Sequence, residues 1–309
     1  MSEFPFIDAD RLGRLLSMEA AIDALEAAFG SDALPAAPLR THIETGAGSL
    51  VAMPATGPLG TGVKLLTVTP GNAEVGRPLI QGLYVLFSVG TQEPEAAIDG
   101  EAITALRTGA VSGLATRYLA RDQAAHLVIF GAGTQARAHL AAMLAVRPID
   151  RVTFVSRTAG RAEALAGSAR EMGVTSEVAG PDAVRAADIV CTCTTSPTPV
   201  FEGSLLSAGS HVNAIGAYTP QTRELDDETI RRGRVVVETR EVALAEAGDL
   251  LIPLGAGSIG PDHVVADLSE VVHGVTVRRS PEDVTVFKSV GVAFEDLVVA
   301  RAAVDRLGA

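Results

Sequence analysis

Three basic residues in the first third of the chain could together bind the carboxylate of a small molecule. Arg40 follows a Pro-Leu pair, Lys64 lies inside an apolar strand-like run, and Arg107 lies among small and apolar residues. A lysine inside an apolar strand is costly to bury unless an anionic group meets it. If the three cations converge on one cleft, they would bind a carboxylate. If they are unrelated surface charges, they bind nothing, and their spacing alone leaves both interpretations open.

A glycine motif in the middle of the chain predicts a dinucleotide-binding loop. Gly131, Gly133 and Ala136 follow a short apolar run at 127–130 and open a helix-like segment. Gly131 would allow a tight turn, Gly133 would let the backbone approach a pyrophosphate, and Ala136 would let the helix lie close to a sheet. The alternative is an ordinary glycine-rich loop between a strand and a helix. A second pattern of this kind, at 255–260, is flanked by prolines and is interpreted as a loop.

The residues after the second predicted strand favour NADP(H) over NAD(H), although NAD(H) remains possible. An NAD-specific site usually has Asp or Glu here to bind the ribose 2′-hydroxyl. Ser156, Arg157 and Thr158 stand there instead, and a guanidinium with hydroxyls suits a 2′-phosphate. The alternative is that Arg157 is a solvated surface residue. Thr194 and Thr195 end the third predicted strand and are expected beside the cofactor, because doubly wound sheets bind ligands at the carboxyl ends of their strands.

Two kinds of domain are needed to position these residues. After a helix at 17–29, short apolar runs separated by turns between 40 and 100 predict an antiparallel sheet. A long helix is expected at 103–119. From residue 127 onward, strands alternate with helices, which predicts a doubly wound parallel sheet of the Rossmann type. The predicted strands of this sheet cover 127–130, 152–156, 189–194, 211–215 and 235–238.

The fold class is therefore α/β, with a Rossmann doubly wound domain and a separate β-rich domain. The Rossmann domain is expected at 121–291. The β-rich domain is expected to be discontinuous, because the last helical segment can pack back on the first part of the chain. It would combine residues 1–120 with residues 292–309.

Composition and charge exclude several classes of protein. The chain has 309 residues, of which 47% are hydrophobic and 20% charged, enough for about two domains with sizeable cores. Its 25 Lys and Arg against 37 Asp and Glu give a net charge of -12, which argues against binding to nucleic acid. Two cysteines, and six histidines without ligand-like spacing, predict neither a disulfide framework nor a metal site. Without a membrane-spanning run or a visible signal peptide, a cytoplasmic protein with no membrane partner is expected.

In ordered segments along nearly the whole chain, the sequence resembles the ornithine cyclodeaminase/μ-crystallin family. The resemblance implies a homodimer in which the Rossmann domain binds the cofactor and the β-rich domain binds the substrate and forms the dimer interface. It also implies hydride transfer between NAD(P)H and an amine or imine carbon next to a carboxylate. The matching segments are 50–55, 63–65, 99–100, 103–115, 131–136, 156–158, 213–216, 223–226, 246–251 and 285–291, followed by Glu295 and Asp296.

The resemblance also implies roles for residues of both predicted domains. Arg40, Lys64 and Arg107 are the expected catalytic residues and bind the substrate carboxylate, with Gln81 and Met53 beside them. The proton donor to the imine nitrogen, either Lys64 or an ordered water, is left open. Lys288 matches a family motif without an assigned role. The expected cofactor-binding residues are Thr108, Gly131, Gly133, Thr134, Gln135, Ser156, Arg157, Thr158, Thr194, Thr195, Ala217 and Ser289.

One departure from the family pattern bears on the reaction. Cyclodeaminases of this family carry an aspartate in the loop after the fourth strand, where this chain has Tyr218. A phenol with a pKa of about 10 cannot supply a carboxylate at neutral pH. The resemblance therefore favours NAD(P)H-dependent reduction of an imine next to a carboxylate, such as the cyclic ketimine Δ1-pyrroline-2-carboxylate, to an L-amino or imino acid. The alternatives are an ornithine cyclodeaminase, an amino-acid dehydrogenase acting on an acyclic imine, and a small-molecule binding protein of the μ-crystallin type.

Overall fold

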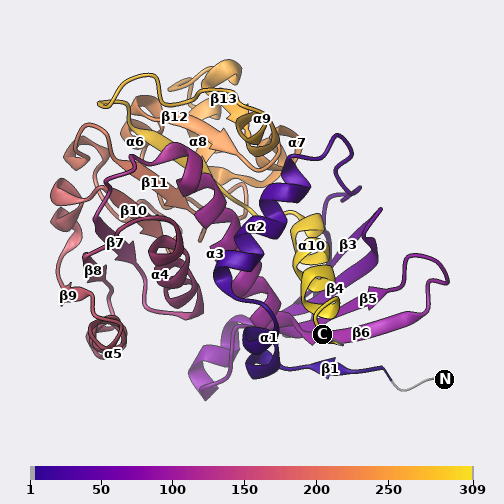
Figure 1. Ribbon diagram of the computed structural model, residues 1–309. Coiled ribbons are helices and arrows are strands. Elements are labelled where there is room, and N and C mark those ends of the chain that lie inside the picture. The colour runs from indigo at the N-terminus through magenta and orange to yellow at the C-terminus, as the bar shows by residue number, and fades with distance from the viewer. Residues whose placement is uncertain (1–3, 308–309) are drawn as a thin grey trace. The chain divides into compact units, whose positions relative to one another are not determined.

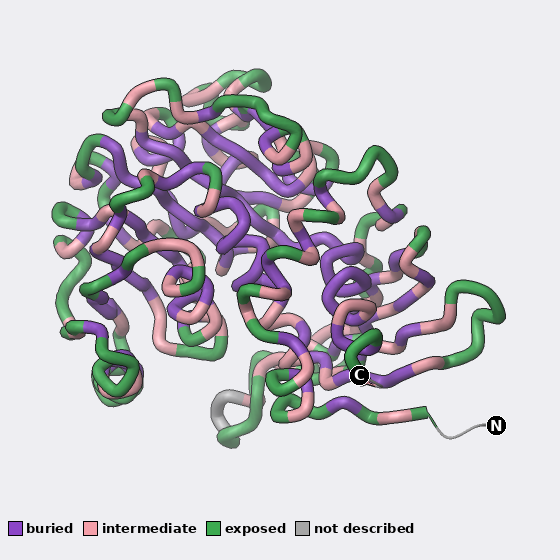
Figure 2. The backbone as a smooth tube through the Cα atoms, in the orientation of Figure 1, coloured by how far each residue is buried: buried purple, intermediate pink, exposed green. Residues whose placement is uncertain are grey.

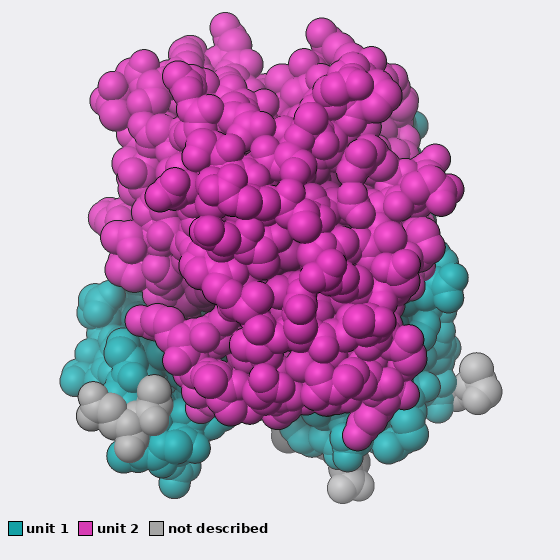
Figure 3. Space-filling view, turned by 90° about the vertical axis from the view of Figure 1, so that its left-hand side faces the viewer, with its two compact units in different colours: residues 1–107, 292–309 teal, residues 108–291 magenta. Residues whose placement is uncertain are grey.

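The structure is a computed structural model that describes residues 4–307, apart from the side chains of residues 73 and 74. The chain divides into unit 1, Met1–Arg107 with Val292–Ala309, and unit 2, Thr108–Gly291 (Figure 3). The first boundary falls inside the long helix α3 (Gly100–Leu119), earlier than the boundary expected at residue 120. The two ends of the predicted β-rich domain, 1–3 and 308–309, lie outside the described residues.

Unit 1 is built on a six-stranded sheet (Figure 1). Neighbouring strands are antiparallel, except that β1 is parallel to β6. Helix α10 packs against β3, β4, β5 and helix α2, and α1 packs against α10. The strand order is β1 (Phe6–Ile7), β6 (Pro94–Asp99), β5 (Ile80–Phe87), β4 (Gly60–Val68), β3 (Gly48–Gly57) and β2 (Thr41–Thr45), and the helices are α1 (Ala9–Leu15), α2 (Met18–Phe29) and α10 (Ala293–Val304). The antiparallel sheet and the helix at 17–29, with Ser17 as its N-cap, are confirmed.

The two faces of this sheet differ in burial. On β4, Gly62, Lys64 and Leu66 are buried, whereas Leu65 and Thr67 are exposed. Side chains alternate between the faces of a strand, so the buried set faces the helix layer. Helix α10 is buried along nearly its whole length, which accounts for its apolar sequence. Any charged side chain on the inner face, or on α10, must therefore find a partner inside the unit.

Unit 2 is an eight-stranded sheet in which every neighbouring pair is parallel. The strand order is β13 (Val264–Asp267), β12 (Arg234–Val237), β14 (Thr285–Lys288), β11 (His211–Ala214), β10 (Ile189–Thr192), β7 (His126–Phe130), β8 (Arg151–Val155) and β9 (Thr175–Val178). The helices are the second half of α3, then α4 (Thr134–Val146), α5 (Ala159–Glu171), α6 (Asp227–Arg232), α7 (Arg240–Glu246), α8 (Gly248–Gly255) and α9 (Leu268–Val272). The predicted doubly wound parallel sheet is confirmed.

The strand order reverses between β7 and β10, because β8 and β9 follow β7 on one side and β10 and β11 lie on the other. A reversal of this kind opens a crevice at the carboxyl ends of the strands, where doubly wound proteins bind ligands. Figure 2 shows that buried residues are concentrated along the central strands of this sheet, such as β7, β10 and β11. The second glycine pattern, at 255–260, begins at the last residue of α8 and continues as a turn, as predicted.

Three strands of unit 2 are not predicted by the sequence pattern, and neither is β1 of unit 1. β9 and β13 are short edge strands with exposed positions, and β14 is the last strand in the sequence but lies between β11 and β12. β11 and β12 are therefore not neighbours. A strand that inserts between two earlier ones leaves no local signal of its place in the sheet.

Candidate active site

Lys64 is fully buried on β4, and its ammonium group faces a carboxylate of α10. Its Nζ lies 2.9 Å from Oδ1 and 2.8 Å from Oδ2 of Asp296, whose side chain is also fully buried. A buried ammonium group needs such a partner, because the loss of its hydration is otherwise uncompensated. The sheet thus positions Lys64, and the first turn of α10 positions its counter-ion.

Arg107, on the part of α3 that belongs to unit 1, joins the same cluster. Its Nη1 donates to Oε2 of Glu295 at 3.0 Å, and its Nε lies 3.3 Å from Oδ1 of Asp296. Asp296 is therefore shared between Lys64 and Arg107. Two cations and two carboxylates balance each other in this charge cluster, which consists of Lys64, Arg107, Glu295 and Asp296.

The surroundings of Lys64 lower its pKa from 10.5 to about 8. Burial is the largest cause, and the positive charge of Arg107 is the second; the carboxylate of Asp296 opposes both. Arg40, which is half-buried, lowers the pKa of Lys64 further, so it acts on the same ammonium group. A lysine with a pKa of about 8 is mostly protonated at neutral pH and can still give up its proton.

Two further side chains on the inner face lie opposite Lys64 in the strand registers. Met53 pairs with Lys64 across β3 and β4 and is buried. Tyr84 pairs with Lys64 across β4 and β5, and its hydroxyl has no hydrogen-bond partner among the described residues. Burial, with a further contribution from Asp296, raises the pKa of the Tyr84 phenol above its usual range.

Gln81 is not brought to Lys64. It pairs with Thr67 across β4 and β5 and is exposed, like Thr67. Because side chains alternate along a strand, the register places Gln81 on the face opposite Lys64 and Tyr84. The expectation that Gln81 orients the substrate carboxylate therefore gains no support from the arrangement of this sheet.

The counter-ions Glu295 and Asp296 are the residues of the site to which sequence reasoning assigned no role. The sequence does contain a signal for Glu295 and Asp296. Two adjacent acids lie inside an apolar helix that is itself buried, and a buried carboxylate must meet a cation. Their partners could not be named, because Arg107 lies 188 positions from Glu295 and Lys64 lies 232 positions from Asp296.

In unit 2, the glycine loop has the conformation that the motif predicts. Gly131 has φ +108°, and a Cβ atom there would lie 2.4 Å from the carbonyl oxygen of Cys193, so only glycine fits. Gly133 is the N-cap of α4 without a side-chain hydrogen bond, and a Cβ atom there would meet nothing within 4 Å. Ala136 is fully buried, as its contact with the sheet requires. The loop and the start of α4, with exposed Thr134, thus offer backbone N–H groups to an anion.

Two of the residues expected at the cofactor carry buried polar atoms that lack a hydrogen-bond partner within the described part of the chain. Oγ1 of Thr108 and Oε1 of Gln135 have no hydrogen-bond partner among the described residues. Such atoms usually bind water or a ligand, because an unsatisfied buried group costs about 1–3 kcal/mol. The residues present therefore fit a bound dinucleotide.

The loop after β8 lies beside the glycine loop. The backbone N–H of Gly131 donates to the carbonyl oxygen of Val155 at 2.8 Å, which joins the ends of β7 and β8. Ser156 follows Val155, and its hydroxyl accepts from the N–H of Thr158 at 3.2 Å. Arg157 is exposed between them, where its guanidinium can meet a charged group of a ligand.

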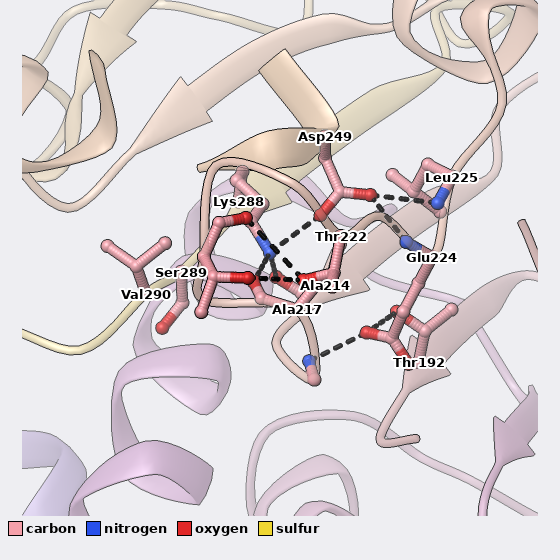
Figure 4. Close-up of polar contacts among 12 residues, drawn as sticks. Thr192, Ala214, Ala217, Thr222, Glu224, Leu225, Asp249, Lys288, Ser289 and Val290 are labelled. Atoms are coloured by element: carbon pink, nitrogen blue, oxygen red, sulfur yellow. Dashed lines mark hydrogen bonds and ion pairs between the residues drawn. The ribbon is translucent and has the colours of Figure 1, made fainter. Parts of the chain in front are cut away.

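The remaining expected cofactor residues differ in their hydrogen bonds, and Figure 4 shows one of them, Ala217, beside Lys288. Thr194 donates its N–H and its hydroxyl to Glu224, and the next residue, Thr195, is exposed. The carbonyl oxygen of Ala217 accepts from Lys288 at 2.5 Å. The hydroxyl of Ser289 donates to Glu238, so this side chain is already used within the protein.

Neither a metal centre nor a membrane-spanning helix is found among residues 4–307. Within residues 4–307, no group of three or more His, Cys, Asp or Glu residues is placed to hold a metal ion. Within the same residues, no helix has the length and apolar character needed to cross a membrane.

Comparisons with known proteins identify the family of this chain. The model of the ornithine cyclodeaminase/mu-crystallin family matches residues 6–309. Δ1-Pyrroline-2-carboxylate reductase of Bacillus cereus is 41% identical over 245 residues, covering 78% of this chain and 75% of that protein. The structure of Thermococcus litoralis Δ1-pyrroline-2-carboxylate reductase with NADH and L-proline is 34% identical with a TM-score of 0.92, covering 97% of this chain and 96% of that one. An archaeal alanine dehydrogenase dimer with bound NAD is 33% identical with a TM-score of 0.92, covering 99% and 96%.

Proposed function

Because this chain belongs to the ornithine cyclodeaminase/mu-crystallin family, we propose that it is an NAD(P)H-dependent oxidoreductase that reduces a C=N bond next to a carboxylate. The favoured substrate is Δ1-pyrroline-2-carboxylate, which would be reduced to L-proline. The observation that carries the proposal is the charge cluster, in which Lys64 and Arg107 are buried on ion pairs with α10. Cations that ion pairs hold in place inside an apolar unit can orient the carboxylate of a small molecule.

In this proposal, the cations of unit 1 bind and orient the substrate. Arg40, Lys64 and Arg107 bind its carboxylate, and Met53 contacts its apolar ring. Glu295 and Asp296 hold two of the three cations in place, so that little conformational entropy is lost when the substrate binds. Fixing the carboxylate also fixes the adjacent C=N carbon, which makes the reaction effectively intramolecular.

Reduction of an imine needs one hydride and one proton. The bound cofactor would supply the hydride to the imine carbon. The imine nitrogen takes a proton, because an iminium ion is the better electrophile. Lys64 is the proton donor that we propose, since its pKa of about 8 keeps it protonated at neutral pH and lets it release the proton.

The carboxyl edge of the unit 2 sheet is the proposed cofactor site, with NADP(H) preferred over NAD(H). The pyrophosphate would bind the N–H groups of the glycine loop and of the start of α4. Ser156, Arg157 and Thr158 support the preference, because no carboxylate stands there to repel a 2′-phosphate. The solved relatives named above carry NADH or NAD, so both cofactors belong in the assay.

We also propose that the protein is a homodimer that pairs through the outer face of the unit 1 sheet. Ile43, Leu65 and Leu83 are exposed to 52%, 42% and 44% on the face opposite Lys64. Leu65 and Leu83 pair directly across β4 and β5, and a contiguous exposed apolar patch is typical of an interface. The archaeal alanine dehydrogenase, which resembles this chain over 99% of its length, is described as a dimer.

A second candidate activity is the reductive amination of a 2-oxo acid through an acyclic imine. The similarity to the archaeal alanine dehydrogenase favours it, because the fold match is as close as that to the pyrroline-2-carboxylate reductase. An ornithine cyclodeaminase is disfavoured by Tyr218, which stands in the loop after β11 where a catalytic carboxylate is needed.

The deciding experiment is a turnover assay of the purified protein that follows the loss of reduced nicotinamide. Δ1-Pyrroline-2-carboxylate is compared with its six-membered homologue, and with pyruvate in the presence and absence of ammonia, each with NADPH and with NADH. Reduction of the cyclic imines without ammonia is expected. Turnover only with pyruvate and ammonia would support the dehydrogenase instead, and cofactor binding without any turnover would support a binding protein of the μ-crystallin type.

A further inference from the structure

The carboxylate of Glu224 is a heavily hydrogen-bonded group at the carboxyl edge of the unit 2 sheet, and the proposed function does not use it. It is fully buried and accepts four hydrogen bonds, and Figure 4 shows it beside Thr192 and Asp249. Its Oε2 accepts from Oγ1 of Thr192 at 2.9 Å and from the N–H of Gly216 at 2.6 Å. Its Oε1 accepts from the N–H of Thr194 at 2.7 Å and from the Thr194 hydroxyl at 2.6 Å. One carboxylate thus ties the end of β10 to the loop after β11.

These loops are packed without spare room. A Cβ atom on Gly216 would lie 2.1 Å from the carbonyl oxygen of Thr194, and one on Gly131 would lie 2.4 Å from the carbonyl oxygen of Cys193. The glycine loop after β7, the loop after β10 and the loop after β11 are therefore in direct contact, in the order of their strands in the sheet. Glu224 holds the loop after β10 in place. Because that loop contacts the glycine loop after β7, Glu224 also restricts the glycine loop on one side.

A buried ion pair in turn holds Glu224. Oδ1 of Asp249 accepts from the backbone N–H groups of Glu224 and Leu225, each at 2.8 Å. Oδ2 of Asp249 lies 2.8 Å from Nζ of Lys288. Lys288 also donates to the carbonyl oxygens of Ala214 and Ala217, at 3.3 and 2.5 Å. The network runs from the end of β14 to the loops after β10 and β11.

We propose that Glu224 is a positioning residue for the dinucleotide, holding the loops after β10 and β11 in the shape that receives the cofactor. The proposal rests on the proposed function, in that the cofactor binds at this edge of the sheet. Buried charges seldom add net stability, and replacing them with apolar side chains is often neutral or stabilising. The presence of a carboxylate with four donors is therefore better explained by conformational specificity than by stability. Hydrogen bonds are directional and select a single loop conformation, whereas apolar packing has no comparable directionality.

Glu224→Gln is the first test. A glutamine has one acceptor oxygen, and its amide group would bring N–H donors against the donors of Thr192 and Gly216. At least one loop must then move. We expect the Kd for NADPH to rise about tenfold, equal to about 1.4 kcal/mol, while kcat at saturating NADPH stays within about threefold of wild type. The Kd is read directly from NADPH fluorescence, because the chain contains no tryptophan.

A second pair of variants leaves the Glu224 side chain in place. Thr192 is fully buried and donates one bond to Glu224. Thr192→Val keeps its shape and removes the donor, whereas Thr192→Ser keeps the donor. We expect a severalfold rise in the Kd for NADPH with valine and recovery with serine. If Glu224→Gln does not fold, this pair of variants tests the positioning role of Glu224 instead.

Asp188→Asn is the matched control, because Asp188 precedes the first residue of the same strand, β10. Its carboxylate accepts from the N–H groups of Ala125 and His126 at 2.9 and 3.0 Å and pairs with Arg121. We expect this variant to lower the Tm and leave the Kd for NADPH unchanged. An unchanged Kd in Glu224→Gln and Thr192→Val, with only a lower Tm, would overturn the positioning role. Absence of binding of NADPH and NADH by the wild-type protein would instead overturn the proposed function.

Discussion

Replacing Asp296 with asparagine should shift the pH dependence of imine reduction to lower pH. Burial and the charge of Arg107 lower the pKa of Lys64, and Asp296 is the largest cause that raises it, so the pKa rests at about 8. Without the carboxylate, the pKa of Lys64 falls further. The proposed roles of Lys64, binding a carboxylate and donating a proton, both need its charged form. Activity of the wild type should therefore fall as the pH rises through about 8, and activity of the variant should fall from a lower pH.

The size of the shift follows from the 2.8 Å contact between Nζ of Lys64 and Oδ2 of Asp296. A pair of unit charges about 4 Å apart at an effective dielectric constant of about 20 interacts by about 4 kcal/mol, and one pKa unit equals about 1.4 kcal/mol. Glu295 and Arg107 remain in the variant, so the change in the pKa of Lys64 is smaller than this interaction energy alone would give. We therefore expect the midpoint of the pH profile to fall by at least about one unit. The measurement is kcat/KM for Δ1-pyrroline-2-carboxylate at saturating NADPH, across the neutral and alkaline range.

Glu95→Gln is the control for this experiment. Glu95 on β6 pairs with Arg301 on the same helix, α10, at 2.7 and 2.9 Å, but this pair is partly exposed. Its removal should leave the pH profile at that of the wild type. If Asp296→Asn binds NADPH normally and keeps the wild-type pH profile, Lys64 is not the group that titrates, and its assignment as proton donor is refuted.

Three further outcomes are expected. Lys64→Met should lower kcat/KM for the imine by about 100-fold or more, since it removes a carboxylate-binding cation that is also the proposed proton donor, while the Kd for NADPH measured by fluorescence stays unchanged; normal turnover would end the assignment. Arg157→Ala should raise the KM for NADPH about tenfold and leave the KM for NADH unchanged, and equal effects on both would show that Arg157 does not meet a 2′-phosphate. Leu83→Lys should convert a dimer to monomers in light scattering, because it places a charge on the apolar face, and an unaltered mass would exclude that face as the interface.

The fold could be predicted where local pattern determines it. The strand, glycine loop and helix around Gly131 and Ala136 have a period and a spacing that are visible in a short window, and the structure contains them. The antiparallel character of residues 40–100 follows from turns between short apolar runs. The place of β14 between β11 and β12 could not be predicted, because strand order depends on contacts far apart in the sequence.

The same division applies to the candidate site. The sequence points to Lys64 because a charge inside an apolar strand is visible locally. The register, which depends on where two strands begin to pair, decides that Met53 lies beside Lys64 and Gln81 on the other face. The partners of the cations, and the donors that converge on Glu224, come from segments that only folding brings together.

The carboxylates of α10 also determine how the cations of unit 1 can act on a substrate. Three cations without partners would repel one another, and burying them would cost several kcal/mol each. Because Glu295 and Asp296 balance Lys64 and Arg107, unit 1 can fold before any ligand arrives. A substrate carboxylate then joins cations that already have partners, so it adds less binding energy than it would at a bare cation. The cluster is better suited to orienting the substrate than to holding it tightly, and orientation raises the rate of the chemical step.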